Sequence, residues 1–98
     1  MVQHLIVPVD GSDSSWHAVD IALSLARRTM SAVRVVEVVF SPSDRADARV
    51  RLEEGIAELD DSDLDLDIEV LLSEETVASA IEAALTDTPG AMVVMSSH

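Results

Sequence analysis

Hydrophobic residues follow two alternating kinds of pattern along the chain. Short runs rich in Val, Leu and Ile predict buried strands, at residues 3–9, 32–40, 66–72 and 91–95. Between them, apolar positions recur every three or four residues and predict helices, at residues 12–29, 42–59 and 77–86. The resulting order, β-α-β-α-β-α-β, predicts an α/β domain: an open parallel sheet with right-handed crossovers and helices on both faces.

Residues that favour helix ends support these boundaries. Thr76 is the expected N-cap of the third helix, and Ser12 or Asp13 that of the first. Ser41 followed by Pro42 is a typical opening for the second helix. The apolar face of this second helix is predicted to consist of Val50, Leu52, Ile56 and Leu59.

Composition and charge narrow the range of partners. The 98 residues suffice for one domain, which we place at residues 1–98. The net charge of −13, with no Lys, repels nucleic acids and anionic membranes, so neither is an expected partner. The chain has no Cys, and it has neither a secretion signal nor an apolar run long enough to span a bilayer. We therefore expect a cytoplasmic protein.

Candidate chemistry gathers where the strands end. Ligands of open parallel sheets bind at the carboxyl ends of the strands, close to where the strand order reverses. Asp10 follows the first apolar run, whereas Ser96, Ser97 and His98 follow the last one. If the first strand is central, these two ends border one crevice, in which Asp10 can accept a hydrogen bond from an exocyclic amine such as that of adenine. The alternative is that Asp10 serves only as a turn or cap residue.

Other functional motifs are absent from the sequence. It contains neither a G-x-G-x-x-G nor a G-x-x-x-x-G-K-[ST] pattern, and its glycines stand only at positions 11, 55 and 90. The histidines have no metal-ligand spacing, so we expect no metal site. Trp16 is interpreted as a packing residue of the first helix.

Four segments together resemble the universal stress protein family. They are HLIVPVDGSDSSWHAVDIALSLARR, VRVVEVV, ASAIEAA and GAMVVMSSH, in this order over essentially the whole chain. The resemblance implies a Rossmann-like fold of the adenine nucleotide alpha-hydrolase type, with strand order 3-2-1-4-5. It also implies a cytoplasmic, dimeric protein, and a subset of the family binds ATP or AMP.

The resemblance assigns roles to individual residues at the nucleotide site. Pro8, Val9 and Asp10 match the segment that surrounds the adenine, in which Asp10 accepts a hydrogen bond from the base. Val38 matches a position whose backbone reads the adenine edge.

The phosphate side of the site is where this sequence departs from the family. Met95 and Ser96 match the start of the ribose- and phosphate-binding loop, and we include Ser97 in the predicted site. In the nucleotide-binding subset this loop continues as Gly, two residues, Gly, nine residues, Gly, and Ser or Thr. Here Ser96 stands in place of the first glycine, and the sequence stops at His98 before the rest of the pattern.

We therefore expect residues 1–98 to be the N-terminal part of the domain, with the fifth strand missing and the edge of the strand at 91–95 covered by another chain or segment. The intact protein is expected to bind ATP or AMP, with Mg, whereas residues 1–98 alone are expected to bind adenosine-type ligands weakly or not at all.

The leading hypothesis is a stress-response sensor or regulator that acts as a homodimer with unidentified protein partners. It is not expected to be an enzyme beyond weak ATP hydrolysis, because no nucleophile–base pair is evident. One alternative is an interaction module that binds no nucleotide. Another is an ATP-hydrolysing enzyme of the pyrophosphatase-loop type, whose Ser-Gly-Gly-x-Asp-Ser turn resembles residues 10–14 only loosely.

Overall fold

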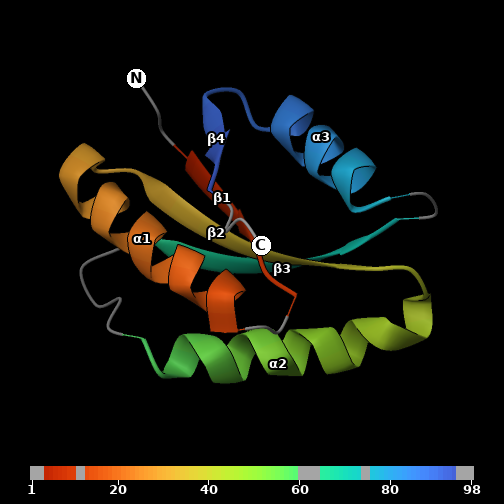
Figure 1. The fold of residues 1–98 in the computed structure, drawn as a ribbon. Helices are drawn as coiled ribbons and strands as arrows, with labels where there is room; N and C mark the ends of the chain where they lie inside the picture. Colours follow the sequence, from red (N-terminus) through yellow and green to blue (C-terminus); the bar gives the residue numbers. More distant parts are fainter. Residues whose placement is uncertain (1–3, 11–12, 60–64, 74–75, 95–98) are drawn as a thin grey trace.

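The computed structural model describes residues 4–10, 13–59, 65–73 and 76–94 (Figure 1). The strands of this part of the chain are β1 (His4–Pro8), β2 (Ala32–Val39), β3 (Leu66–Leu72) and β4 (Ala91–Val93). Its helices are α1 (Asp13–Thr29), α2 (Arg45–Ala57) and α3 (Val77–Asp87), and a short 3-10 turn, η1 (Pro42–Asp44), precedes α2. The predicted alternation of strands and helices is confirmed.

The strands form one sheet in the order β3-β2-β1-β4, and every neighbouring pair is parallel. The register of β1 extends to Pro8↔Val36 on the β2 side and to Ile6↔Val93 on the β4 side. After β4, the Val94 N–H donates a hydrogen bond to the Ile6 carbonyl at 2.9 Å. The strand order 3-2-1-4 is thus confirmed, and the carboxyl ends of β1 and β4 lie side by side at one edge of the sheet.

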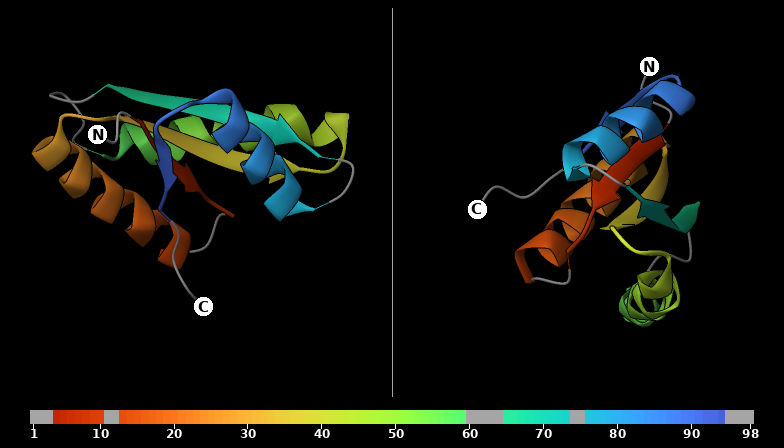
Figure 2. Two further views of the ribbon diagram at one scale, coloured as in Figure 1. Left: turned by 90° about the horizontal axis from the view of Figure 1, so that it is seen from above. Right: turned by 90° about the vertical axis from the view of Figure 1, so that its right-hand side faces the viewer.

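Helices cover both faces of the sheet, with α1 and α2 on one face and α3 on the other (Figures 1 and 2). The main core lies between the sheet and the first two helices and contains Leu5, Val7, Val9, Ala18, Val19, Ala22, Leu23, Ala26, Val33, Val35 and Leu52. Because strand side chains alternate between faces, Ile6 and Val36 are buried on the opposite face, on which Ile81 of α3 is also buried.

The predicted apolar face of α2 is wrong at one position. Val50 is 52% exposed, whereas Ala48 and Leu52 are fully buried. In α2, which begins at Arg45, the side of the helix that carries Ala48 and Leu52 faces the sheet. Val50 lies two residues beyond Ala48, about half a turn around the helix, and therefore faces solvent.

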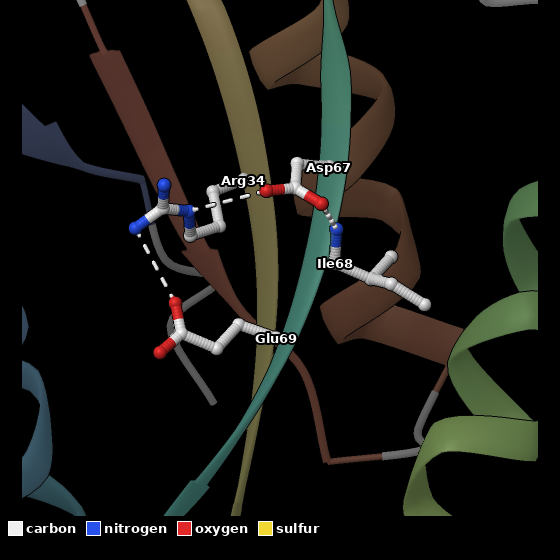
Figure 3. A network of polar contacts seen from close by, with 4 residues as sticks. All are labelled: Arg34, Asp67, Ile68 and Glu69. Carbon is white, nitrogen blue, oxygen red and sulfur yellow. Dashed lines mark hydrogen bonds and ion pairs between the residues drawn. The ribbon is translucent and has the colours of Figure 1, made fainter.

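Two arginines make ion pairs on opposite faces of the sheet. Arg51 of α2 bonds to the buried carboxylate of Glu37 on β2, which ties this helix to the sheet. On the α3 face, Arg34 of β2 lies 3.9 Å from the Asp67 carboxylate and 3.3 Å from that of Glu69, both on β3 (Figure 3). The Arg34 pairs are partly exposed, so they contribute little to stability.

Candidate functional site

The segment that joins β1 to α1 places Asp10 at the carboxyl edge of the sheet. Val9 is buried, and its N–H donates to the Val36 carbonyl at 2.8 Å, which extends the pairing with β2 by one residue beyond β1. Asp10 itself is exposed. Its backbone N–H donates to Oγ of Ser15, a buried residue in the first turn of α1, at 3.3 Å. The backbone of Asp10 is therefore tied both to the sheet and to the helix.

The backbone of Val38 lies on the same side of β2 as the chain that leaves β1. Backbone groups of a strand point alternately to its two neighbours. The Val39 carbonyl accepts a hydrogen bond from Ser73, which follows β3, at 3.0 Å, and the Val36 carbonyl accepts the one from Val9. Val38 therefore shares the β1 side with Val36, two residues beyond the last register pair, Pro8↔Val36. This location suits the predicted role of its backbone.

Part of the predicted site lies outside the described residues. Met95, Ser96 and Ser97 belong to this part, and the N-cap candidate Ser12 also lies outside the described residues. The structure does establish that β4, which leads to residue 95, is the parallel neighbour of β1. The roles of Met95, Ser96 and Ser97 remain predictions.

The four described residues of the predicted site, Pro8, Val9, Asp10 and Val38, combine one charged side chain with apolar ones. Asp10 offers an exposed carboxylate, and Pro8 and Val38 offer half-buried apolar side chains. The N-terminal end of α1, a 17-residue helix that begins at Asp13, provides a positive dipole close to the same edge. Within the part of the chain that the structure describes, no group of three or more His, Cys, Asp or Glu residues is placed to hold a metal ion.

Ser15 is the residue of this site that sequence reasoning missed. Its hydroxyl holds the backbone N–H of Asp10, five residues earlier. The available signal was a serine in the first turn of a helix that directly follows a strand, because such hydroxyls commonly bond to nearby backbone groups.

The fold is that of an open, parallel, Rossmann-like α/β domain. The family model described as "Universal stress protein family" matches residues 1–98, and the chain therefore belongs to the universal stress protein family.

Two solved structures illustrate the likeness. A protein from the universal stress protein family from Burkholderia pseudomallei is 27% identical with a TM-score of 0.83, and the match covers 98% of this chain and 82% of that chain. A universal stress protein solved in complex with cAMP is 17% identical with a TM-score of 0.57, and the match covers 97% of each chain, which shows a common fold. No curated protein matches the chain significantly. Within the described residues, no helix combines the length and apolar character needed to cross a membrane.

Proposed function

We propose that this protein is a stress-response module that binds an adenine nucleotide, ATP or AMP, at the carboxyl edge of its sheet. The observation that carries the proposal is the placement of Asp10. Asp10 lies two residues after β1, an inner strand of the sheet, and its carboxylate is exposed. Its backbone N–H donates a hydrogen bond to Oγ of Ser15 in α1. β4, the parallel neighbour of β1, runs toward the same edge of the sheet and pairs with β1 as far as Ile6. Open parallel sheets commonly bind their ligands at this edge.

Each residue of the site has a proposed task. Asp10 accepts a hydrogen bond from the exocyclic amine of adenine, and Pro8 and Val9 border the ring. The backbone of Val38 contacts the edge of the base. Support for an adenine ligand comes from the universal stress protein that was solved with cAMP, because cAMP carries the same base on a related fold.

On the basis of the family resemblance, we propose that Met95, Ser96 and Ser97 contact the ribose and phosphates of the nucleotide. When bound, the nucleotide brings the negative charge of its phosphates to this edge of the sheet. Bound Mg²⁺ neutralises part of this charge, which matters in a chain of net charge −13. The protein then acts as a sensor or regulator and not as a rapid catalyst.

We further infer that it works as a cytoplasmic homodimer, and sedimentation equilibrium across a concentration series tests the dimer.

Calorimetric titration with adenosine, inosine and ATP tests the proposal. Adenosine is uncharged, so its binding reports the base and ribose contacts without the phosphates. For the 98-residue chain we expect an adenosine dissociation constant on the order of 1 mM, and ATP without Mg²⁺ should bind no more tightly. Inosine has a carbonyl group in place of the amine and should bind about tenfold more weakly, because a carboxylate cannot donate to it.

The matched variants are Asp10→Asn and Asp87→Asn. Both remove one negative charge, but Asp87 lies at the exposed C-terminal end of α3. We expect Asp10→Asn to weaken adenosine binding about tenfold and Asp87→Asn to leave it unchanged. Equal binding of adenosine and inosine, or an unaltered Asp10→Asn variant, would contradict the proposal. Undetectable binding of both adenosine and ATP–Mg²⁺ would favour an interaction module instead.

A further inference from the structure

An open cleft with a volume of about 540 Å³ lies between α1 and the C-terminal end of α2. It is lined by Trp16, His17, Asp20, Gly55, Glu58 and Leu59. These residues take no part in the proposed nucleotide site. In Figure 1 the two helices lie on the same face of the sheet, and the N-terminal end of α1 approaches α2.

Trp16 is held against the backbone of α2 at Gly55. A Cβ atom added to Gly55 would overlap the Cη2 and Cζ2 atoms of the Trp16 ring, so the ring can lie here only because residue 55 has no side chain. Trp16 is half-buried and packs against the main core, while it also contributes to the wall of the cleft. The indole is therefore a fixed part of this wall.

Two carboxylates border the same cleft. Asp20 follows Trp16 by four residues on α1, so both lie on one side of that helix. Glu58 is the C-cap of α2 and follows Gly55 by three residues. Asp20 and Glu58 are exposed, and no Lys or Arg contributes to the described lining of the cleft.

The end of α2 adds to the negative potential of the cleft. A helix carries a partial negative charge at its C-terminus, which basic residues in the last turn usually balance. α2 has no basic residue in its last turn. The negative end of the helix therefore adds to the charge of Glu58 instead of being compensated.

We propose that this cleft binds a guanidinium group, supplied by an arginine side chain of a partner protein. A guanidinium is planar and can stack on the indole of Trp16 while its N–H groups donate to the carboxylates of Asp20 and Glu58. The net charge of −13 favours a partner with a basic surface and attracts it over distance at low salt. The proposal does not depend on nucleotide binding.

Intrinsic fluorescence provides a direct test, because Trp16 is the single tryptophan of the sequence. The probes are N-acetyl-arginine amide and its uncharged analogue N-acetyl-citrulline amide, titrated into the whole chain. We expect a saturable change in Trp16 emission with the arginine derivative, with a dissociation constant on the order of 1–10 mM. The citrulline derivative should bind at least about tenfold more weakly, because it lacks the charge. Free arginine should bind no more tightly than the amide, because an arginine within a protein has neither the free α-ammonium nor the free α-carboxylate.

Charge-neutralising variants separate the cleft from the general acidity of the chain. Asp20→Asn and Glu58→Gln should each raise the dissociation constant about threefold, and the double variant about tenfold. The control is Glu82→Gln, which changes the net charge equally at an exposed position on α3, across the sheet. Circular dichroism checks that all variants stay folded.

Three results would overturn the inference. Equal binding of the arginine and citrulline derivatives would show that the charge is not recognised. An effect of Glu82→Gln as large as that of Glu58→Gln would indicate unspecific attraction to the acidic chain. Free arginine bound more tightly than the amide would point to a small-molecule site in place of a protein partner, because it would show that the free α-ammonium and α-carboxylate are recognised.

Discussion

The backbone N–H of Asp10 donates a hydrogen bond to Oγ of Ser15 at 3.3 Å. This contact connects the residue after the central strand to the first turn of α1. Because Ser15 is buried, the hydroxyl is held in place by the packing of the helix. The carboxylate of Asp10 is thereby presented from a fixed backbone at the edge of the sheet.

Replacing Ser15 tests this connection. Ser15→Ala leaves the Asp10 N–H without its hydroxyl partner, and we expect a loss of about 1 kcal/mol in the free energy of unfolding. Adenosine binding should weaken about threefold as the Asp10 segment loosens. Urea denaturation and calorimetric titration measure the two effects. Ser24→Ala, at an exposed position of the same helix, should change neither, and equal effects of both variants would contradict the assigned role.

The contact between Trp16 and Gly55 predicts an unusual response to Gly55→Ala. In an exposed helix this change stabilises by about 1 kcal/mol. Here the new methyl group overlaps the indole ring, so we expect a net destabilisation of about 1–3 kcal/mol. The Trp16 emission should also shift to the red as the ring is displaced into solvent. In a Trp16→Ala background the same substitution should become neutral or stabilising, and a similar loss in both backgrounds would contradict the packing.

The pair of Arg51 and Glu37 predicts how stability depends on pH. The hydrogen bond from Arg51 to Glu37, and then the charge of Glu37, raise the pKa of Arg51, and Asp47 and Asp44 add to the effect. A raised pKa contributes stability that is fully present below the ordinary pKa of arginine and is lost only as the pH rises through the raised value. The chain has no Lys, Tyr or Cys, the side chains that ordinarily titrate in the mildly alkaline range.

We therefore expect the urea midpoint to stay constant between about pH 9 and 11. Arg51→Met should lower the midpoint by the same amount throughout this range, because it leaves the carboxylate of Glu37, 9% exposed, without its partner. The double variant Glu37→Leu/Arg51→Met should recover most of the loss. A midpoint that falls over this range in the wild type but not in Arg51→Met would contradict the explanation.

The start of α3 offers a test of local helix stability. The hydroxyl of Thr76 accepts a hydrogen bond from the Ser79 N–H at 3.0 Å, as expected of an N-cap. Thr76→Ala should lower the free energy of unfolding by about 1 kcal/mol, and Thr76→Ser should restore most of it. Thr86→Ala is a suitable control, because Thr86 bonds only within the helix, to the Glu82 carbonyl. If both alanine variants lose the same amount, the cap is not the cause.

The elements of this fold could be predicted because local sequence signals agree with the tertiary structure. Alternation of apolar runs and helical periodicity located every described strand and helix, and the N-cap at Thr76 is confirmed. The strand order 3-2-1-4 could not be predicted from these local signals, because alternation alone does not say on which side of β1 a strand is added. That order came from the family resemblance.

Contacts between elements were beyond the reach of sequence patterns. Val50 shares the spacing of its apolar neighbours, but the docking angle of α2 turns it toward solvent. Glu37 lies within a run of valines, and nothing local indicates that Arg51 from the next helix would reach it. The cleft beside Trp16 depends likewise on how α1 packs beside α2.

The central claim is that adenine binds at the carboxyl edge of the sheet beside Asp10, and amide chemical-shift mapping of the ¹⁵N-labelled chain during an adenosine titration tests it most directly. The account predicts that the largest shifts fall on Val9, Asp10 and Val38, while amides of α2 and α3 stay unchanged. Shifts that cluster elsewhere, or that persist undiminished in Asp10→Asn, would contradict it.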